Sequence, residues 1–146
     1  MSDKVKALII LGGTFLFLFM FVFFKAGKFE DDKGRGHFFQ QDIDQYYSYL
    51  PAYFIYDDLS FNFDNEYWLM EAPNGERVPK VTMGMAFTYA PWFLIADGIA
   101  QANPEYERDG YSEPYVTWVR FGVYFYFFLG LFFLSLALLK FFKPHI

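Results

Sequence analysis

Cysteine is missing from this chain of 146 residues, and histidine occurs only at His37 and His145. The first absence excludes disulfide bonds and thiolate metal sites, and the second excludes a histidine-rich zinc or haem site. Basic residues are also few, since 12 Lys and Arg stand against 17 Asp and Glu, for a net charge of −5. Because nucleic-acid-binding domains carry basic patches, this balance argues against DNA or RNA as a partner.

Aromatic and apolar residues are abundant instead. The chain is 25% aromatic, with 22 Phe and 12 Tyr, and 55% hydrophobic. Two stretches carry no charge at all, residues 7–24 and residues 121–139. About 20 apolar residues of helix cross a hydrocarbon core of about 30 Å. The sequence therefore predicts an all-α membrane protein with two transmembrane helices.

A signal peptide is the alternative interpretation of the first stretch, because Lys4 and Lys6 precede it. The run exceeds the ~7–15 residues of a signal core and ends without an A-x-A cleavage pattern, which favours an uncleaved anchor. Lys140 and Lys143 follow the second run. Because basic flanks stay in the cytoplasm, both termini are predicted to be cytoplasmic, in a bacterial inner membrane.

The segment between the two runs is expected to form an extracytoplasmic loop. Residues 25–120 contain 16 of the 17 acidic residues and 8 of the basic ones. This gives three parts: residues 1–24 with the first helix, the loop at 25–120, and residues 121–146 with the second helix. The loop is too aromatic for a disordered linker.

Helical periodicity runs from Asp42 to Leu59, with Ile43, Tyr47, Leu50 and Phe54 on one stripe. Tyrosines line a neighbouring stripe. Such a helix suits the membrane–water interface, so we expect a juxtamembrane helix on the outer leaflet. Because proline lacks an amide proton, Pro51 is expected to kink it.

Two further elements are expected in the loop. Asn74-Gly75 lies between two short apolar runs and indicates a β-hairpin, which Pro73 and Pro79 weaken. Residues 83–102 form an apolar segment that Pro91 and Asp97 interrupt. It is therefore interpreted as an interfacial or partly re-entrant helix rather than a third span.

Residues 42–59, which read DIDQYYSYLPAYFIYDDL, resemble the start of bacterial GT-C-type integral membrane glycosyltransferases. Three later pieces match the same pattern in order: residues 80–84 with 90–96, residues 109–115, and the second apolar run. This family includes relatives of protein mannosyltransferases and lipid A aminoarabinose transferases. Its members have many spans, with a large loop between the first two.

The resemblance implies an incomplete transferase. GT-C enzymes use a polyprenyl-phosphate sugar or a lipid-linked oligosaccharide as donor, on the extracytoplasmic side of the membrane. This chain is accordingly expected to be the N-terminal fragment of such an enzyme and inactive alone. Its partners would be membrane lipid, the lipid-linked donor, and further transmembrane helices of the full-length chain or of another subunit.

The resemblance also names site residues. A carboxylate is the usual base for the acceptor proton, and by position Asp42 is the candidate general base. Family members carry Asp-Gly-x-Gly-Tyr-Tyr where this chain has DIDQYY, so Asp44 is an additional and weaker candidate. Capping of a helix is the structural alternative for both acids. The weaker candidates for substrate binding are Tyr46, Tyr47, Tyr49 and Asp109.

Metal and cofactor sites have little support in the sequence. Residues 30–32 and the pair Asp57-Asp58 are acidic, but such clusters are more typical of solvated turns than of metal sites. No cofactor is indicated, and a divalent metal is compatible with the reaction without being supported by the residues. The alternative function is that of a non-enzymatic two-span subunit or scaffold.

Overall fold

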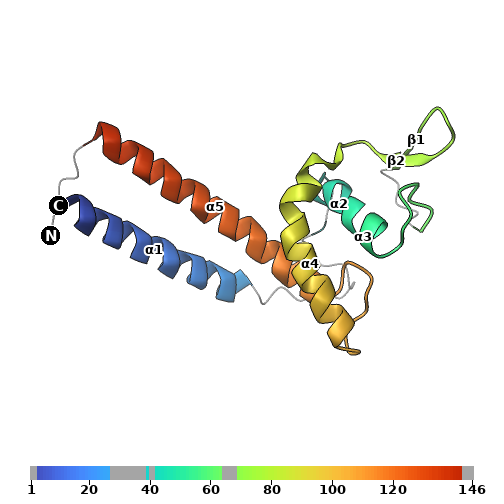
Figure 1. Ribbon diagram of the computed structural model, residues 1–146, viewed down its shortest axis with the longest axis horizontal. Helices are drawn as coiled ribbons and strands as arrows, with labels where there is room; N and C mark the ends of the chain where they lie inside the picture. The colour runs from blue at the N-terminus through green and yellow to red at the C-terminus, as the bar shows by residue number, and fades with distance from the viewer. Residues whose placement is uncertain (1–2, 27–38, 40–41, 64–68, 143–146) are drawn as a thin grey trace. The chain divides into compact units, whose positions relative to one another are not determined.

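The computed structural model describes residues 3–26, 39, 42–63 and 69–142. The chain divides into two compact units, which are treated separately below. Unit 1 comprises Met1–Lys28 and Phe121–Ile146, and unit 2 comprises Phe29–Arg120. The elements are shown in Figure 1: α1 (Asp3–Ala26), α2 (Asp42–Tyr47), α3 (Tyr49–Phe54), β1 (Leu69–Glu71), β2 (Arg77–Pro79), the 3₁₀ turn η1 (Met83–Met85), α4 (Ala86–Ala102) and α5 (Glu113–Phe141).

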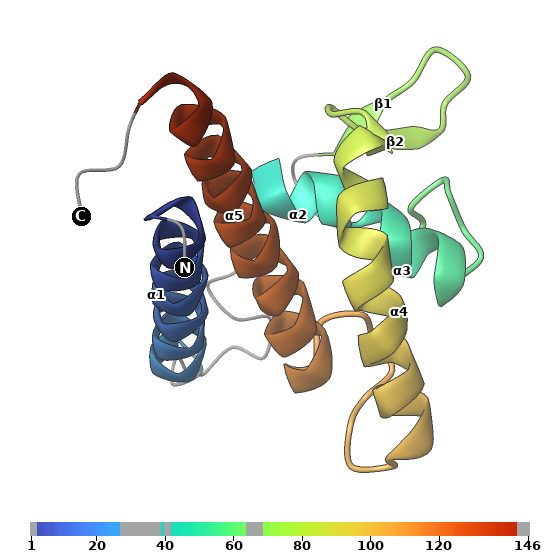
Figure 2. The ribbon, with the colours of Figure 1, turned by 60° about the vertical axis from the view of Figure 1, so that its left-hand side comes forward.

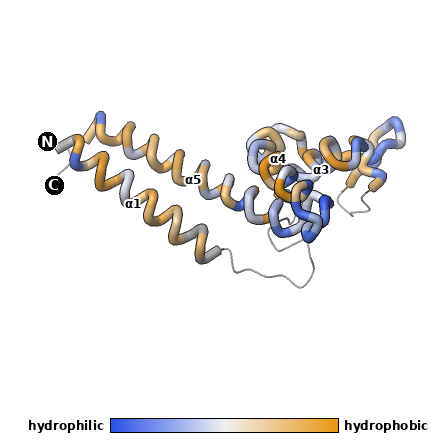
Figure 3. The backbone as a smooth tube through the Cα atoms, turned by 60° about the horizontal axis from the view of Figure 1, so that its bottom comes forward, coloured by the Kyte–Doolittle hydropathy of each residue, from blue (hydrophilic) through white to orange (hydrophobic). Residues whose placement is uncertain are grey.

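Unit 1 consists of two apolar helices that pack through phenylalanine rings. Phe15 of α1 meets Phe132 of α5 edge to face at 6.3 Å between ring centroids, and Phe19 meets Phe121 at 5.0 Å. Residues later in α1 thus pair with residues earlier in α5, so the two helices are antiparallel. Figure 3 shows hydrophobic colouring along both helices.

Within the described residues, one helix is long and apolar enough to cross a membrane, and this is α5. The apolar stretch found among the described residues of α1 is shorter, Val5–Phe21, within a helix of 24 residues. Two spans were predicted, and the structure provides one candidate span with a shorter apolar helix.

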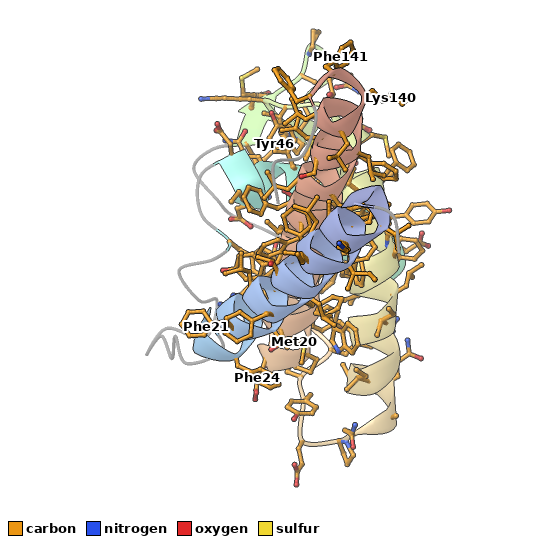
Figure 4. The ribbon with its side chains drawn as sticks, turned by 90° about the vertical axis from the view of Figure 1, so that its left-hand side faces the viewer. Met20, Phe21, Phe24, Tyr46, Lys140 and Phe141 are labelled. Carbon is orange, nitrogen blue, oxygen red and sulfur yellow. The ribbon has the colours of Figure 1, made fainter. Side chains whose placement is uncertain are left out.

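Exposed apolar side chains cover much of unit 1. Figure 4 labels Met20, Phe21 and Phe24 near the C-terminal end of α1, and all three are exposed. Lys140 and Phe141 lie at the C-terminal end of α5, where Phe141 is 81% exposed. An apolar helix surface of this kind is typical of helices that face lipid or other apolar helices.

Helix α5 begins at Glu113, well before the uncharged run that starts at Phe121. The start is fixed locally: the amides of Tyr115 and Val116 donate to the carbonyl of Ser112, at 3.0 and 3.3 Å. Pro114 lies in the first turn, where its missing amide proton costs no helical hydrogen bond. The first turns of α5 belong to unit 2 and help to build its core.

The predicted helix over residues 42–59 is shorter than expected and forms two pieces, α2 and α3. The interruption lies at Ser48, three residues before Pro51. A residue at position 51 would donate its amide to the carbonyl of Tyr47, and proline cannot. Ser48 keeps right-handed helical angles, φ −56° and ψ −23°. Helix α3 ends at Phe54, and Asp57 then adopts a positive φ of 49°.

A short antiparallel hairpin forms where Asn74-Gly75 predicted it. Strands β1 and β2 pair with Met70 opposite Val78. Gly75 has a φ of 83° and donates its amide to the carbonyl of Ala72 at 2.8 Å. Because side chains rarely adopt this φ, glycine suits the position.

Helix α4 lies alongside α2 and α3 in unit 2, as Figures 1 and 2 both show. Together with η1 it covers the predicted segment 83–102, and it is not among the helices apolar and long enough to span. Its buried face supplies Phe93 to the centre of the core, where Tyr47 of α2 and Tyr115 of α5 are also fully buried. The core of unit 2 is aromatic: Phe39, Tyr47, Leu50, Ala86, Tyr89, Phe93, Ala96, Ala100, Tyr111, Tyr115 and Val119.

Candidate functional site

Asp97 is the centre of the main polar cluster in unit 2. It lies on the buried face of α4 and is only 5% exposed. The Arg108 guanidinium donates to both carboxylate oxygens, from Nε to Oδ1 at 2.9 Å and from Nη2 to Oδ2 at 3.0 Å. The Tyr115 hydroxyl donates to Oδ1 at 2.7 Å, and the Gln101 amide donates to Oδ2 at 2.6 Å.

This cluster keeps Asp97 charged. Burial alone would raise the pKa of the carboxyl, but hydrogen bonds from Arg108, Tyr115 and Gln101 and the positive charge of Arg108 outweigh it, so the pKa is lowered. A buried carboxylate is stable only when its oxygens have such partners. All four donors are already in place, so Asp97 ties α4 to the Arg108 loop and to α5.

The sequence indicated Asp97 only as a charge that interrupts an apolar segment. The structure shows it buried. Gln101 is one helical turn away and is visible as an i, i+4 pair. Arg108 and Tyr115 are 11 and 18 residues away, and no local pattern predicted those contacts.

A second buried contact joins α2 to the loop before α5. The Tyr47 ring is fully buried, stacks on Phe39 at 4.0 Å, and its hydroxyl donates to the carbonyl of Gly110. Burial is the main cause that raises the pKa of Tyr47 well above 10.0, with nearby Tyr111 adding to it. Tyr47 therefore remains a neutral donor in the core.

Gly110 fits this contact because of both its conformation and its size. Its φ is 86°, and a Cβ built there would lie 2.7 Å from Cβ of Pro51. That separation is shorter than real Cβ contacts, so only glycine lets the loop approach α3 this closely. The segment from Asp109 to Ser112 is thereby held against the helix that follows the acid pair.

The two acids of the predicted site have different environments. Asp42 is the first residue of α2 and is exposed, and within the described residues its carboxylate makes no hydrogen bond or ion pair. Asp44 is buried, at 7% exposed. Of the two, Asp42 is the one whose carboxylate a ligand can reach, and its proposed role as a base stays a prediction.

The predicted substrate-binding residues are mostly engaged in packing. Tyr47 is buried as described, and the Tyr49 hydroxyl donates to the carbonyl of Val81 at 2.8 Å. Tyr46 is half-buried and is labelled in Figure 4. Asp109 accepts the amides of Tyr111 and Ser112 through Oδ1 at 2.7 and 2.8 Å. These contacts give Tyr47, Tyr49 and Asp109 structural roles, and Tyr46 packs partly buried against the core of unit 2.

The paired acids Asp57-Asp58 form a turn rather than a ligand set. Asp58 accepts the amides of Ser60 and Asn62, at 2.9 and 2.8 Å. Among the described residues no three His, Cys, Asp or Glu side chains gather closely enough to hold a metal ion. The acidic stretch at residues 30–32 lies outside the described residues.

Comparison of the chain with protein-family models, with characterised proteins and with solved structures found no match in any of the three. The resemblance to GT-C transferases therefore depends on the residues quoted for it above.

Proposed function

We propose that this chain is the N-terminal, membrane-anchored part of a GT-C-type glycosyltransferase that uses a polyprenyl-phosphate sugar. The residues that resemble the family, 42–59, form α2, α3 and the turn after them. The single observation that supports a site there is the accessible, unpaired carboxylate of Asp42 within the described residues. The helix behind it is fixed through Tyr47 and Gly110.

In the proposed reaction, Asp42 acts as the general base. An acceptor hydroxyl attacks the anomeric carbon of the donor from the face opposite the phosphate. The new carbon–oxygen bond forms as the bond to the phosphate oxygen breaks, with inversion. The acceptor proton passes to the Asp42 carboxylate, and polyprenyl phosphate leaves with the electron pair. A positioned base of this kind contributes about 10²–10⁴-fold to the rate.

We also propose that further transmembrane helices, from a longer chain or from a partner subunit, complete the substrate cavity. The exposed apolar side chains of α1 and α5 are compatible with such neighbours. On this view the 146 residues alone transfer no sugar. A non-enzymatic two-span subunit is the second candidate, and the same exposed surfaces favour it, because they fit partner helices whether or not chemistry occurs.

The test is sugar transfer in membranes that contain the product of the natural gene, with radiolabelled polyprenyl-phosphate sugars as donors. Asp42→Asn should reduce transfer by about 10²-fold or more at unchanged protein level, because asparagine cannot accept the proton. Asp57→Asn is the matched control, because Asp57 is also exposed and asparagine tolerates its positive φ.

Three outcomes separate the hypotheses. Loss of transfer in Asp42→Asn alone supports the assigned base. Loss in Asp44→Asn with full activity in Asp42→Asn would move the role to the buried acid. Absence of transfer from every polyprenyl-phosphate donor tested, with natural protein present, favours the scaffold.

A further inference from the structure

Helix α4 has its polarity inverted relative to an ordinary surface helix. The one charged residue within its bounds, Asp97, is on the buried face. The exposed face has no charge: Phe87, Thr88, Pro91, Leu94, Ile95, Gly98, Gln101 and Ala102. Phe87 is 69% exposed and Leu94 is 48% exposed. A helix face in water usually carries charged residues, so this face is suited to an apolar surrounding.

The exposed residues form one continuous stripe along the helix. Phe87, Pro91, Leu94 and Gly98 follow each other at spacings of four, three and four, which places them on one side of an α-helix. Thr88 and Gln101 lie toward the two ends of this face. Met83 and Met85 of η1, at the N-terminal end of α4, are exposed as well. The stripe is apolar in its middle and uncharged throughout.

The short connection between α4 and α5 indicates that a lipid bilayer covers this face. Only residues 103–112 separate α4 from α5, the one described helix that is long and apolar enough to cross a membrane. The Asp97 cluster also holds α4 to Tyr115, six residues before the uncharged run begins at Phe121. Six residues span at most about 20 Å even when fully extended. A bilayer crossed by α5 is therefore within reach of α4.

We infer that the uncharged face of α4 is a membrane-binding surface that inserts into the headgroup and acyl boundary of the bilayer that α5 crosses. This depends on the membrane anchoring in the proposed function but not on the transferase chemistry. The buried Asp97 cluster then has a second consequence. It removes the only charge of α4 from the lipid-facing side and satisfies it inside unit 2.

The inference is tested with single-cysteine spin labels, which the absence of native cysteine makes direct. The full chain is reconstituted in phosphatidylcholine–phosphatidylglycerol vesicles, with the label at Leu94→Cys. Collision with oxygen, which concentrates in lipid, is compared with collision with a water-soluble nickel chelate. Phe127→Cys in the α5 run is the lipid control, and Glu105→Cys in the exposed loop is the water control.

The spin label at Leu94 should collide more often with oxygen than with the nickel chelate, as the label at Phe127 should. Its depth in the bilayer should be about 5–10 Å. The label at Thr88→Cys, at the edge of the face, should be shallower. The inference would be overturned if the label at Leu94 collided with the nickel chelate as often as the label at Glu105 does, while the label at Phe127 still collided mainly with oxygen. That result would leave the membrane anchoring by α5 intact. Low collision with both reagents at Leu94 would overturn it in favour of a protein contact. Nickel access at Phe127 would refute the anchor and the inference together.

Discussion

At the scale of single residues, the two acids that drew attention in the sequence have separate environments. Asp42 is exposed and Asp44 is buried, although they are two positions apart on one short helix. The residue with the most developed polar environment is Asp97, which accepts from Arg108, Tyr115 and Gln101. An accessible carboxylate is available for chemistry, whereas a carboxylate with every oxygen engaged serves the fold.

Tyr115→Phe should loosen the contact between α4 and α5. It removes one hydrogen bond to a charged group, and the expected loss of local stability is about 1.5 kcal/mol. Hydrogen exchange of the α4 amides in the full chain measures it. Tyr106→Phe is the matched control, since the Tyr106 hydroxyl makes no hydrogen bond within the described residues. Equal exchange in the two variants would show that the Asp97 contact does not stabilise α4.

The Asp97 cluster also predicts a pH dependence. The pKa of Asp97 in the folded chain lies below its usual value of 3.8. Its stabilisation is therefore complete above that usual pKa and is lost as pH falls through the lower, folded value. Protection of α4 amides, corrected for intrinsic exchange, should drop below about pH 4 in the natural chain and change less in Asp97→Asn. An identical pH profile in both proteins would contradict the assignment.

At the scale of elements, the sequence identified the hairpin and the segment 83–102 because each has a local cause. Asn74-Gly75 supplies the positive φ that the turn needs. The 42–59 helix was less well predicted, because it is interrupted at Ser48 rather than at Pro51 and ends at Phe54. An uncharged run does not predict the start of α5 at Glu113, because Glu113 and Arg120 are charged and lie in the first turns of the helix.

Gly110→Ala should destabilise unit 2 more than Gly75→Ala. Both glycines have a φ near +85°, at 86° and 83°, so both variants bear the same backbone strain. A Cβ at position 110 would also collide with Pro51, whereas position 75 has open space. The difference should be about 1–3 kcal/mol, typical of overpacking. Chemical denaturation of the detergent-solubilised chain measures this difference in the free energy of unfolding. An equal loss of stability in both variants would mean that the Gly110 loop moves away from Pro51 at no cost.

At the scale of the whole molecule, the candidate site was only partly predictable. The carboxylate of Asp42 was visible as a motif, but the burial of Tyr47 depends on Phe93 and the Gly110 loop, which are distant in sequence. Membrane character was clearer, because an uncharged run is a local property. The number of spans was not settled by composition, since α1 contributes a shorter apolar stretch than α5.

We propose that α1 and α5 both cross the membrane and that unit 2 lies outside the cytoplasm, where a polyprenyl-phosphate sugar is presented. Cysteine accessibility in spheroplasts tests it most directly, with a membrane-impermeant maleimide and single cysteines at Ser2, Glu105 and His145. The account predicts that Glu105→Cys reacts in intact spheroplasts, whereas Ser2→Cys and His145→Cys react only after permeabilisation. Reaction of Ser2→Cys from outside would show that α1 does not cross the membrane, and protection of Glu105→Cys would place the loop on the wrong side for the proposed donor.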